Sequence, residues 1–159
     1  KTIDKIMDEI IEIIKADFDS LGWKYEVETH DERVLIKTVM EGKNEMIYIC
    51  IRIFPAQNRY QILCMPDTTI AKEHIDGAIA AMNEFNLFSS TVCGSIGYEG
   101  NIVFWLGRHT NGGAFSTDAF DTDFRAVLLA ADNETAQIYK KAYTARKASA
   151  KKLFSFFKR

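Results

Sequence analysis

Hydrophobic positions at the start of the chain recur every three or four residues, most clearly over residues 2–20. That spacing is typical of an α-helix with one apolar face. Thr2 is a suitable N-terminal cap, and Gly22 follows the last apolar position, where helices commonly end. The pattern therefore predicts an amphipathic helix over residues 2–20. Its apolar positions are Ile3, Ile6, Met7, Ile10, Ile13, Ile14 and Phe18.

The pattern then changes to the two-residue alternation of β-strands. Runs of this kind cover residues 23–29, 33–40, 45–54 and 60–65, with short turns between them. Short connections favour antiparallel neighbours, so we expect a four-stranded meander. The third run places Ile47, Ile49, Ile51 and Ile53 on one face. A face this apolar needs a layer of helices over it.

The opposite face of this sheet is the first candidate for function. A tight turn at residues 41–44 would place Val34 opposite Ile51, and a symmetric loop at residues 55–59 would place Cys50 opposite Cys64. With that pairing, the face is more apolar and aromatic than a solvated face should be. Its members are Met46, Tyr48, Cys50, Arg52, Phe54, Tyr60, Ile62 and Cys64.

Helix and strand patterns follow one another again in the second half of the chain. Apolar spacing predicts a helix over residues 70–86, then a hairpin of residues 91–98 and 101–109 about the turn Glu99-Gly100. Ser116 or Thr117 can cap a third helix that continues to Tyr143. The order α-ββββ-α-ββ-α indicates an α+β fold, an antiparallel sheet with helices packed on one face. We expect one domain over residues 1–147 and a tail over residues 148–159.

The residues at the joints of these elements are similar to those of a known bacterial family. The strand ending at Met65-Pro66 leads through Asp67-Thr68-Thr69 into a helix that ends with Met82-Asn83-Glu84-Phe85-Asn86, and the last helix contains Leu128-Leu129-Ala130-Ala131-Asp132. Over about residues 5–143 this arrangement resembles the YbjN family. Its members are described as regulators of sensory transduction and share a fold with type III secretion chaperones. The resemblance implies a regulatory or chaperone-like module without a catalytic motif. We expect Asn83 and Asn86 to cap the end of their helix.

The distribution of charge singles out the end of the chain. Residues 140–159 hold eight basic side chains and no acidic one, whereas residues 1–139 hold 12 basic and 22 acidic ones. The tail also carries phenylalanines, so it could lie on an anionic membrane, contact nucleic acid or dock on the acidic domain. The acidic domain disfavours extensive nucleic-acid binding. We therefore expect a membrane or a protein partner to contact Lys151, Lys152, Phe154 and Phe157.

The residues that usually carry catalysis or metal binding are scattered. The three histidines lie far apart, and Cys50, Cys64 and Cys93 form no Cys-x-x-Cys pair. We therefore expect no metal, no cofactor and no enzymatic activity, and reduced thiols buried in a cytoplasmic protein. Two alternatives stay open: a redox pair of Cys50 with Cys64, and an anion site at the loop Asn111-Gly112-Gly113.

These observations favour a binding module over an enzyme. The sheet face is the predicted surface for a partner protein or for a second copy in a homodimer, because aromatic side chains dominate such interfaces. We assign this surface to Tyr48, Arg52, Phe54, Tyr60 and Ile62. The alternative is a membrane-peripheral factor that is recruited by the basic, amphipathic tail.

Overall fold

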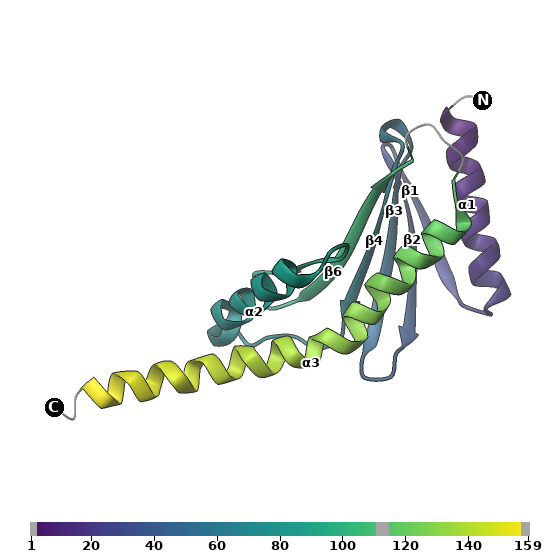
Figure 1. Ribbon diagram of the computed structural model, residues 1–159. Coiled ribbons are helices and arrows are strands. Elements are labelled where there is room, and N and C mark those ends of the chain that lie inside the picture. Colours follow the sequence, from purple (N-terminus) through teal and green to yellow (C-terminus); the bar gives the residue numbers. More distant parts are fainter. Residues whose placement is uncertain (1–2, 111–114, 157–159) are drawn as a thin grey trace.

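The computed structural model describes the backbone of residues 3–110 and 115–156, and the side chains of residues 8–110 and 115–144 (Figure 1). The described residues form three helices and six strands, together with two short 3-10 helices, η1 (Pro55–Gln57) and η2 (Lys72–His74). In chain order, the main elements are α1 (Ile3–Ser20), β1 (Tyr25–His30), β2 (Arg33–Glu41), β3 (Met46–Phe54), β4 (Arg59–Pro66), α2 (Ile75–Phe88), β5 (Cys93–Ile96), β6 (Ile102–His109) and α3 (Thr117–Phe156).

The six strands form one antiparallel sheet in the order β1-β2-β3-β4-β6-β5. The helices pack on one face of this sheet, and α3 crosses it diagonally (Figure 1). The predicted α+β order and the one-sided helix layer are therefore confirmed. The physical reason is the alternation of the strands, which leaves one face almost entirely apolar.

The core lies between this apolar face and the helices. All four isoleucines of β3 are buried, as predicted, and so are Ile10 and Ile14 of α1. Phe18 joins three elements, because its ring lies 5.8 Å from Tyr25 in β1 and 5.9 Å from Phe124 in α3. Such tilted and edge-on aromatic contacts stabilise the core in addition to the burial of the ring surfaces.

The loop of the β2–β3 hairpin lies one residue later than predicted, at residues 42–45 instead of 41–44. Val34 lies opposite Ile53 rather than Ile51, so the register is displaced by two residues and each side chain keeps its predicted face. This loop is stabilised by α3: the Asp132 carboxylate accepts backbone N–H groups of Lys43 (3.1 Å), Asn44 (2.8 Å) and Glu45 (3.1 Å). The three hydrogen bonds attach the loop to the helix layer.

The β3–β4 connection corrects the predicted face of Tyr60 and Ile62. Tyr60 lies opposite Ile53, and Ile62 lies opposite Ile51, so both side chains point into the core, where they are 2% and 0% exposed. The loop contains four residues instead of five, because η1 is followed by Asn58 in the left-handed conformation (φ 47°). A displacement of one residue transfers every side chain of a strand to the other face.

Asn86 also has a different role from the predicted helix cap. Its side-chain amide donates to the Gly94 carbonyl oxygen (2.9 Å), and its carbonyl accepts the Gly94 N–H (2.7 Å), so it occupies the outer edge of β5 as a neighbouring strand would. In the β5–β6 pair, Gly94 lies opposite Phe104, and Cys93 lies opposite Trp105. Gly94 faces the helices, where a Cβ atom would collide with the Met82 sulfur.

Helix α3 continues without a break from Thr117 to Phe156. Figure 1 shows its C-terminal part extending past the sheet and past α2. The backbone of residues 148–156 is therefore part of the same helix as the last residues of the domain. The boundary at residues 147 and 148 stays a prediction.

Candidate interaction surface

The face of the sheet that the helices leave uncovered is defined by alternate residues of neighbouring strands. We call it the open face. Its side chains meet in rows across the sheet, as the pairing of β2, β3, β4 and β6 shows: Val39–Tyr48–Met65, Lys37–Cys50–Leu63–Trp105 and Leu35–Arg52–Gln61. The first two rows are mostly apolar, although no helix covers them.

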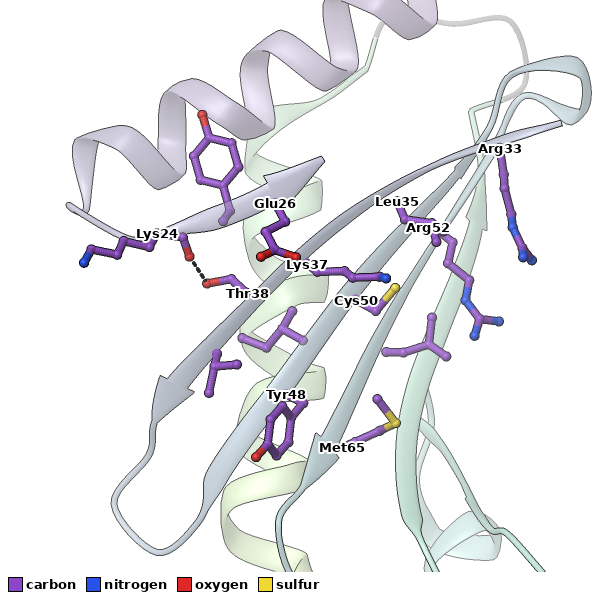
Figure 2. A pocket seen from close by; sticks show the side chains of 14 residues that line it. Lys24, Glu26, Arg33, Leu35, Lys37, Thr38, Tyr48, Cys50, Arg52 and Met65 are labelled. Atoms are coloured by element: carbon purple, nitrogen blue, oxygen red, sulfur yellow. Dashed lines mark hydrogen bonds between the residues drawn. The ribbon is translucent and has the colours of Figure 1, made fainter. Parts of the chain in front are cut away.

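A hollow of about 870 Å³ lies on the open face (Figure 2). Its lining combines apolar and cationic side chains from the first four strands, with Glu26 as its one acidic member among the described residues. Two smaller grooves lie in the helix layer, one of about 350 Å³ between α2 and α3 and one of about 330 Å³ between α1 and α3. Of these three hollows, the one on the open face is the largest.

One end of the open face, near the β2–β3 hairpin, is apolar and exposed. Tyr48 is 45% exposed and its neighbour Val39 is 52% exposed, although both belong to the same sheet as the buried isoleucines. Met65 lies directly opposite Tyr48, and Figure 2 shows the two side chains next to each other on the open face. An exposed aromatic and aliphatic cluster of this kind is typical of binding surfaces.

The other end of the open face carries arginines. Arg52 lies opposite Leu35, and Arg33 precedes Leu35 by two residues on the same face of β2. Leu35 is 8% exposed even though no helix covers it. Farther along, the Arg59 guanidinium lies 4.4 Å from the centre of the Phe54 ring, a cation–π contact.

The predicted partner-binding residues are thus divided between the two faces. Tyr48, Arg52 and Phe54 lie on the open face, whereas Tyr60 and Ile62 are core residues. Leu63 lies opposite Cys50, in the place predicted for Cys64, and Met65 lies opposite Tyr48. Neither residue was among the predicted members of this face. The sequence signal for the shorter loop is Asn58. Asparagine adopts the left-handed conformation more readily than most residues, and this conformation lets β4 begin one residue earlier.

Lys37 and Glu28 form an ion pair at the β1 side of the open face. The Lys37 ammonium group lies 2.6 Å from a Glu28 carboxylate oxygen. This hydrogen bond lowers the pKa of Glu28 and raises the pKa of Lys37. Both groups are well exposed, so the pair orients the side chains more than it stabilises the fold.

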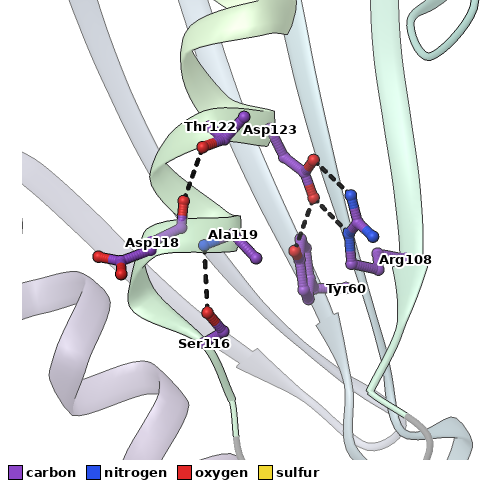
Figure 3. Close-up of polar contacts among 7 residues, drawn as sticks. All are labelled: Tyr60, Arg108, Ser116, Asp118, Ala119, Thr122 and Asp123. Carbon is purple, nitrogen blue, oxygen red and sulfur yellow. Dashed lines mark hydrogen bonds and ion pairs between the residues drawn. The ribbon is translucent and has the colours of Figure 1, made fainter.

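Tyr60 forms a separate polar cluster on the core side (Figure 3). Its hydroxyl donates to the Asp123 carboxylate (2.9 Å), and Arg108 donates two hydrogen bonds to the same carboxylate (2.5 and 2.6 Å). Burial and the bond to Asp123 raise the pKa of Tyr60. Because Asp123 is buried and fully paired, the cluster links β4, β6 and α3 structurally.

The cysteines occupy three different environments. Cys64 is buried, which raises the pKa of its thiol to about 12, whereas Cys50 is partly exposed on the open face and Cys93 is exposed. Cys50 and Cys64 point to opposite faces of the sheet, so the alternative of a redox pair between them is wrong. Within residues 8–110 and 115–144, whose side chains are described, no three potential ligands form a metal-binding group.

For the tail, the structure describes the backbone of residues 148–156 but not their side chains. Lys151, Lys152 and Phe154 lie in the last turns of α3, and Phe157 lies outside the described residues, as does the loop Asn111-Gly112-Gly113. In the part of the chain that the structure covers, none of the helices is long and apolar enough to span a bilayer.

Comparison with known proteins identifies the fold. No family model matches the sequence, and no curated protein matches it either. Among solved structures, the chain is similar to the crystal structure of YbjN from E. coli, described as "a putative transcription regulator". The TM-score is 0.50 at 12% sequence identity, and the match covers 87% of this chain and 93% of that chain. The resemblance to YbjN is therefore confirmed at the level of the fold: this chain has the same architecture as YbjN.

Proposed function

We propose that this protein is a non-enzymatic interaction or regulatory module that binds a partner protein, or a second copy of itself, through the open face of its sheet. The observation that carries the proposal is the exposed apolar row Val39–Tyr48–Met65 on a face without helices. Burying such a row against a partner is favourable by about 25 cal/mol per Å² of apolar surface. The YbjN-like fold is consistent with a regulatory role, and a chaperone-like role would use the same face.

Site-specific photo-crosslinking in the native host tests this proposal. A photoreactive phenylalanine analogue replaces Tyr48 in one variant and Tyr139 in a matched control, because the two tyrosines are similarly exposed, at 45% and 40%, on opposite layers of the domain. We expect a discrete protein adduct from position 48 and none from position 139. Equal adducts from both positions, or none from position 48, would contradict the proposal.

Solution mass then distinguishes the two kinds of partner. If the adduct has twice the mass of the chain, light scattering should show a dimer that persists at high salt, because apolar contacts are not screened. The Tyr48→Asp variant should then be monomeric. A larger or smaller adduct identifies a different protein as the partner.

A second candidate function is recruitment to a membrane surface. It is favoured by the continuation of α3 through Phe156, which carries residues 148–156 beyond the sheet (Figure 1). A helix with lysines and phenylalanines can lie on an anionic bilayer, where each lysine or arginine contributes about 1 kcal/mol.

A further inference from the structure

We propose that the open face recognises an acidic, amphipathic segment of a partner protein. The segment would place carboxylates at the arginine end of the face and apolar side chains at the Tyr48 end. This inference rests on the proposed function, and it specifies the chemistry of the partner.

The charge of the open face is opposite to that of the rest of the domain. Residues 1–139 hold 12 basic and 22 acidic side chains. The hollow nevertheless has four cationic side chains in its lining and, among the described residues, one acidic side chain. The cationic residues are Lys24, Arg33, Lys37 and Arg52. Cations gathered in a hollow raise the local concentration of anionic groups.

The two arginines among these cations are available to a partner. Among the residues that the structure describes, Arg33 and Arg52 form no ion pair, whereas Lys37 is paired with Glu28. Figure 2 shows the guanidinium groups of Arg33 and Arg52 extending from the same side of the sheet. Arginine binds carboxylates with two parallel hydrogen bonds, so this pair favours aspartate or glutamate side chains.

The spacing along β3 suits a short peptide. Tyr48 and Arg52 are four residues apart on one strand and face the same way, a separation of about 13 Å. About four residues of extended peptide, or about nine residues of helix, would span both ends of the face. One short segment can therefore occupy the apolar end and the arginine end together.

Charge argues against two other occupants from this chain. If two copies paired through their open faces, the arginines of both copies would be gathered into one interface, where like charges are unfavourable. The C-terminal residues 140–159 have eight basic and no acidic side chains. They are repelled by the same arginines. An acidic partner segment has the complementary charge.

Selection from a random dodecapeptide phage library tests this inference without a known partner. The full chain is the bait, in four forms: wild type, Arg33→Glu/Arg52→Glu, Tyr48→Asp, and Arg125→Glu as a matched control on the exposed side of α3. Circular dichroism and thermal unfolding confirm that each variant is folded. The binding of selected peptides is then measured by fluorescence anisotropy at two salt concentrations.

We expect the wild type and the Arg125→Glu variant to select peptides in which acidic residues flank apolar ones. Their affinity should fall about tenfold or more for Arg33→Glu/Arg52→Glu, and it should fall with salt. The doubly reversed variant should select basic peptides instead. Apolar peptides without an acidic preference that still need Tyr48 would overturn the inference and leave the proposed function intact. Peptides that bind the Tyr48→Asp variant equally well, or a selection that yields none, would overturn both.

Discussion

The Asp132 carboxylate in α3 accepts the backbone N–H of Asn44 at 2.8 Å, and so attaches the β2–β3 hairpin to the helix layer. Asn44 returns the contact, since its side-chain amide donates to the Asp132 carbonyl oxygen at 3.1 Å. The open face ends at this hairpin, so the two residues also position the apolar row that begins with Val39 and Tyr48.

Replacing Asp132 should destabilise the fold. Burial opposes ionisation of this carboxyl, but the three backbone N–H groups outweigh burial and hold its pKa below the ordinary value of 3.8. Asp132→Ala removes the acceptor for all three groups, and we expect a loss of about 2–3 kcal/mol in the free energy of unfolding by urea. Asp132→Asn keeps one acceptor oxygen and should lose less. Equal stability of the alanine variant and the wild type would contradict this role.

The pH dependence of stability follows from the same group. Because the pKa of Asp132 is lower in the folded state than in the unfolded state, its stabilising contribution is complete above the unfolded value. The contribution decreases as the pH falls through 3.8 towards the folded pKa. Urea unfolding at pH 7 and pH 3 should show a smaller difference between wild type and Asp132→Asn at pH 3. A difference independent of pH would exclude the ionised carboxylate as its source.

Tyr48 and Tyr60, which lie in the adjacent strands β3 and β4, should respond differently to the same change. Tyr48→Asp places a charge on an exposed face and should leave the domain folded, with stability within about 1 kcal/mol of the wild type. Tyr60→Asp buries an unpaired charge beside Asp123 and should prevent folding. Circular dichroism and proteolysis measure both. A folded Tyr60→Asp variant would mean that Tyr60 does not face the core and that β3 and β4 pair in a different register.

The Tyr60–Asp123–Arg108 cluster should be sensitive to which partner is removed. Tyr60→Phe deletes one hydrogen bond but leaves Asp123 paired with Arg108, so we expect a loss of about 1 kcal/mol. Asp123→Ala leaves the buried Tyr60 hydroxyl without its acceptor and should cost about 2–3 kcal/mol. Thermal unfolding of both variants provides the comparison. A larger effect of Tyr60→Phe would mean that the ring, not the carboxylate, organises the cluster.

Asn86 should protect the edge strand β5. Asn86→Ala removes both hydrogen bonds to Gly94, so we expect faster hydrogen exchange in residues 93–96 and a greater tendency to aggregate, because an unpaired edge is exposed. Asn83→Ala is the control, since Asn83 is exposed on the same helix. Similar exchange rates in the two variants would show that the edge does not depend on Asn86.

The tail can be tested separately from the sheet. Full-length chain should bind vesicles that contain anionic lipid, and deletion of residues 151–159 should abolish this binding, since that segment carries four of the basic residues. Flotation at low and high salt measures the effect, and neutral vesicles are the control. Binding that is unaffected by salt or by the deletion would exclude recruitment to a membrane through the tail.

The elements themselves could be predicted from the sequence, because they depend on local periodicity. The spacing of Ile10, Ile14 and Phe18 defines the buried side of α1, and the alternation in residues 47–53 defines the core face of β3. Both patterns are repeated several times, so an error of one residue at an end does not change them. The displacement by two residues in the β2–β3 hairpin left every side chain on its predicted face, because strand side chains alternate with a period of two.

The composition of the candidate site was decided by the tertiary structure. Tyr60 and Ile62 belong to the core because a four-residue loop ending at Asn58 displaces β4 by one residue. The alternation of β4 is incomplete, since Leu63 and Met65 make its open side partly apolar as well. The contacts of Asp132 with the 42–45 loop and of Asn86 with β5 likewise join residues that are far apart in sequence or in different elements. Local pattern therefore determined which residues form helices and strands, whereas loop geometry and the packing of α3 decided which side chains the open face presents.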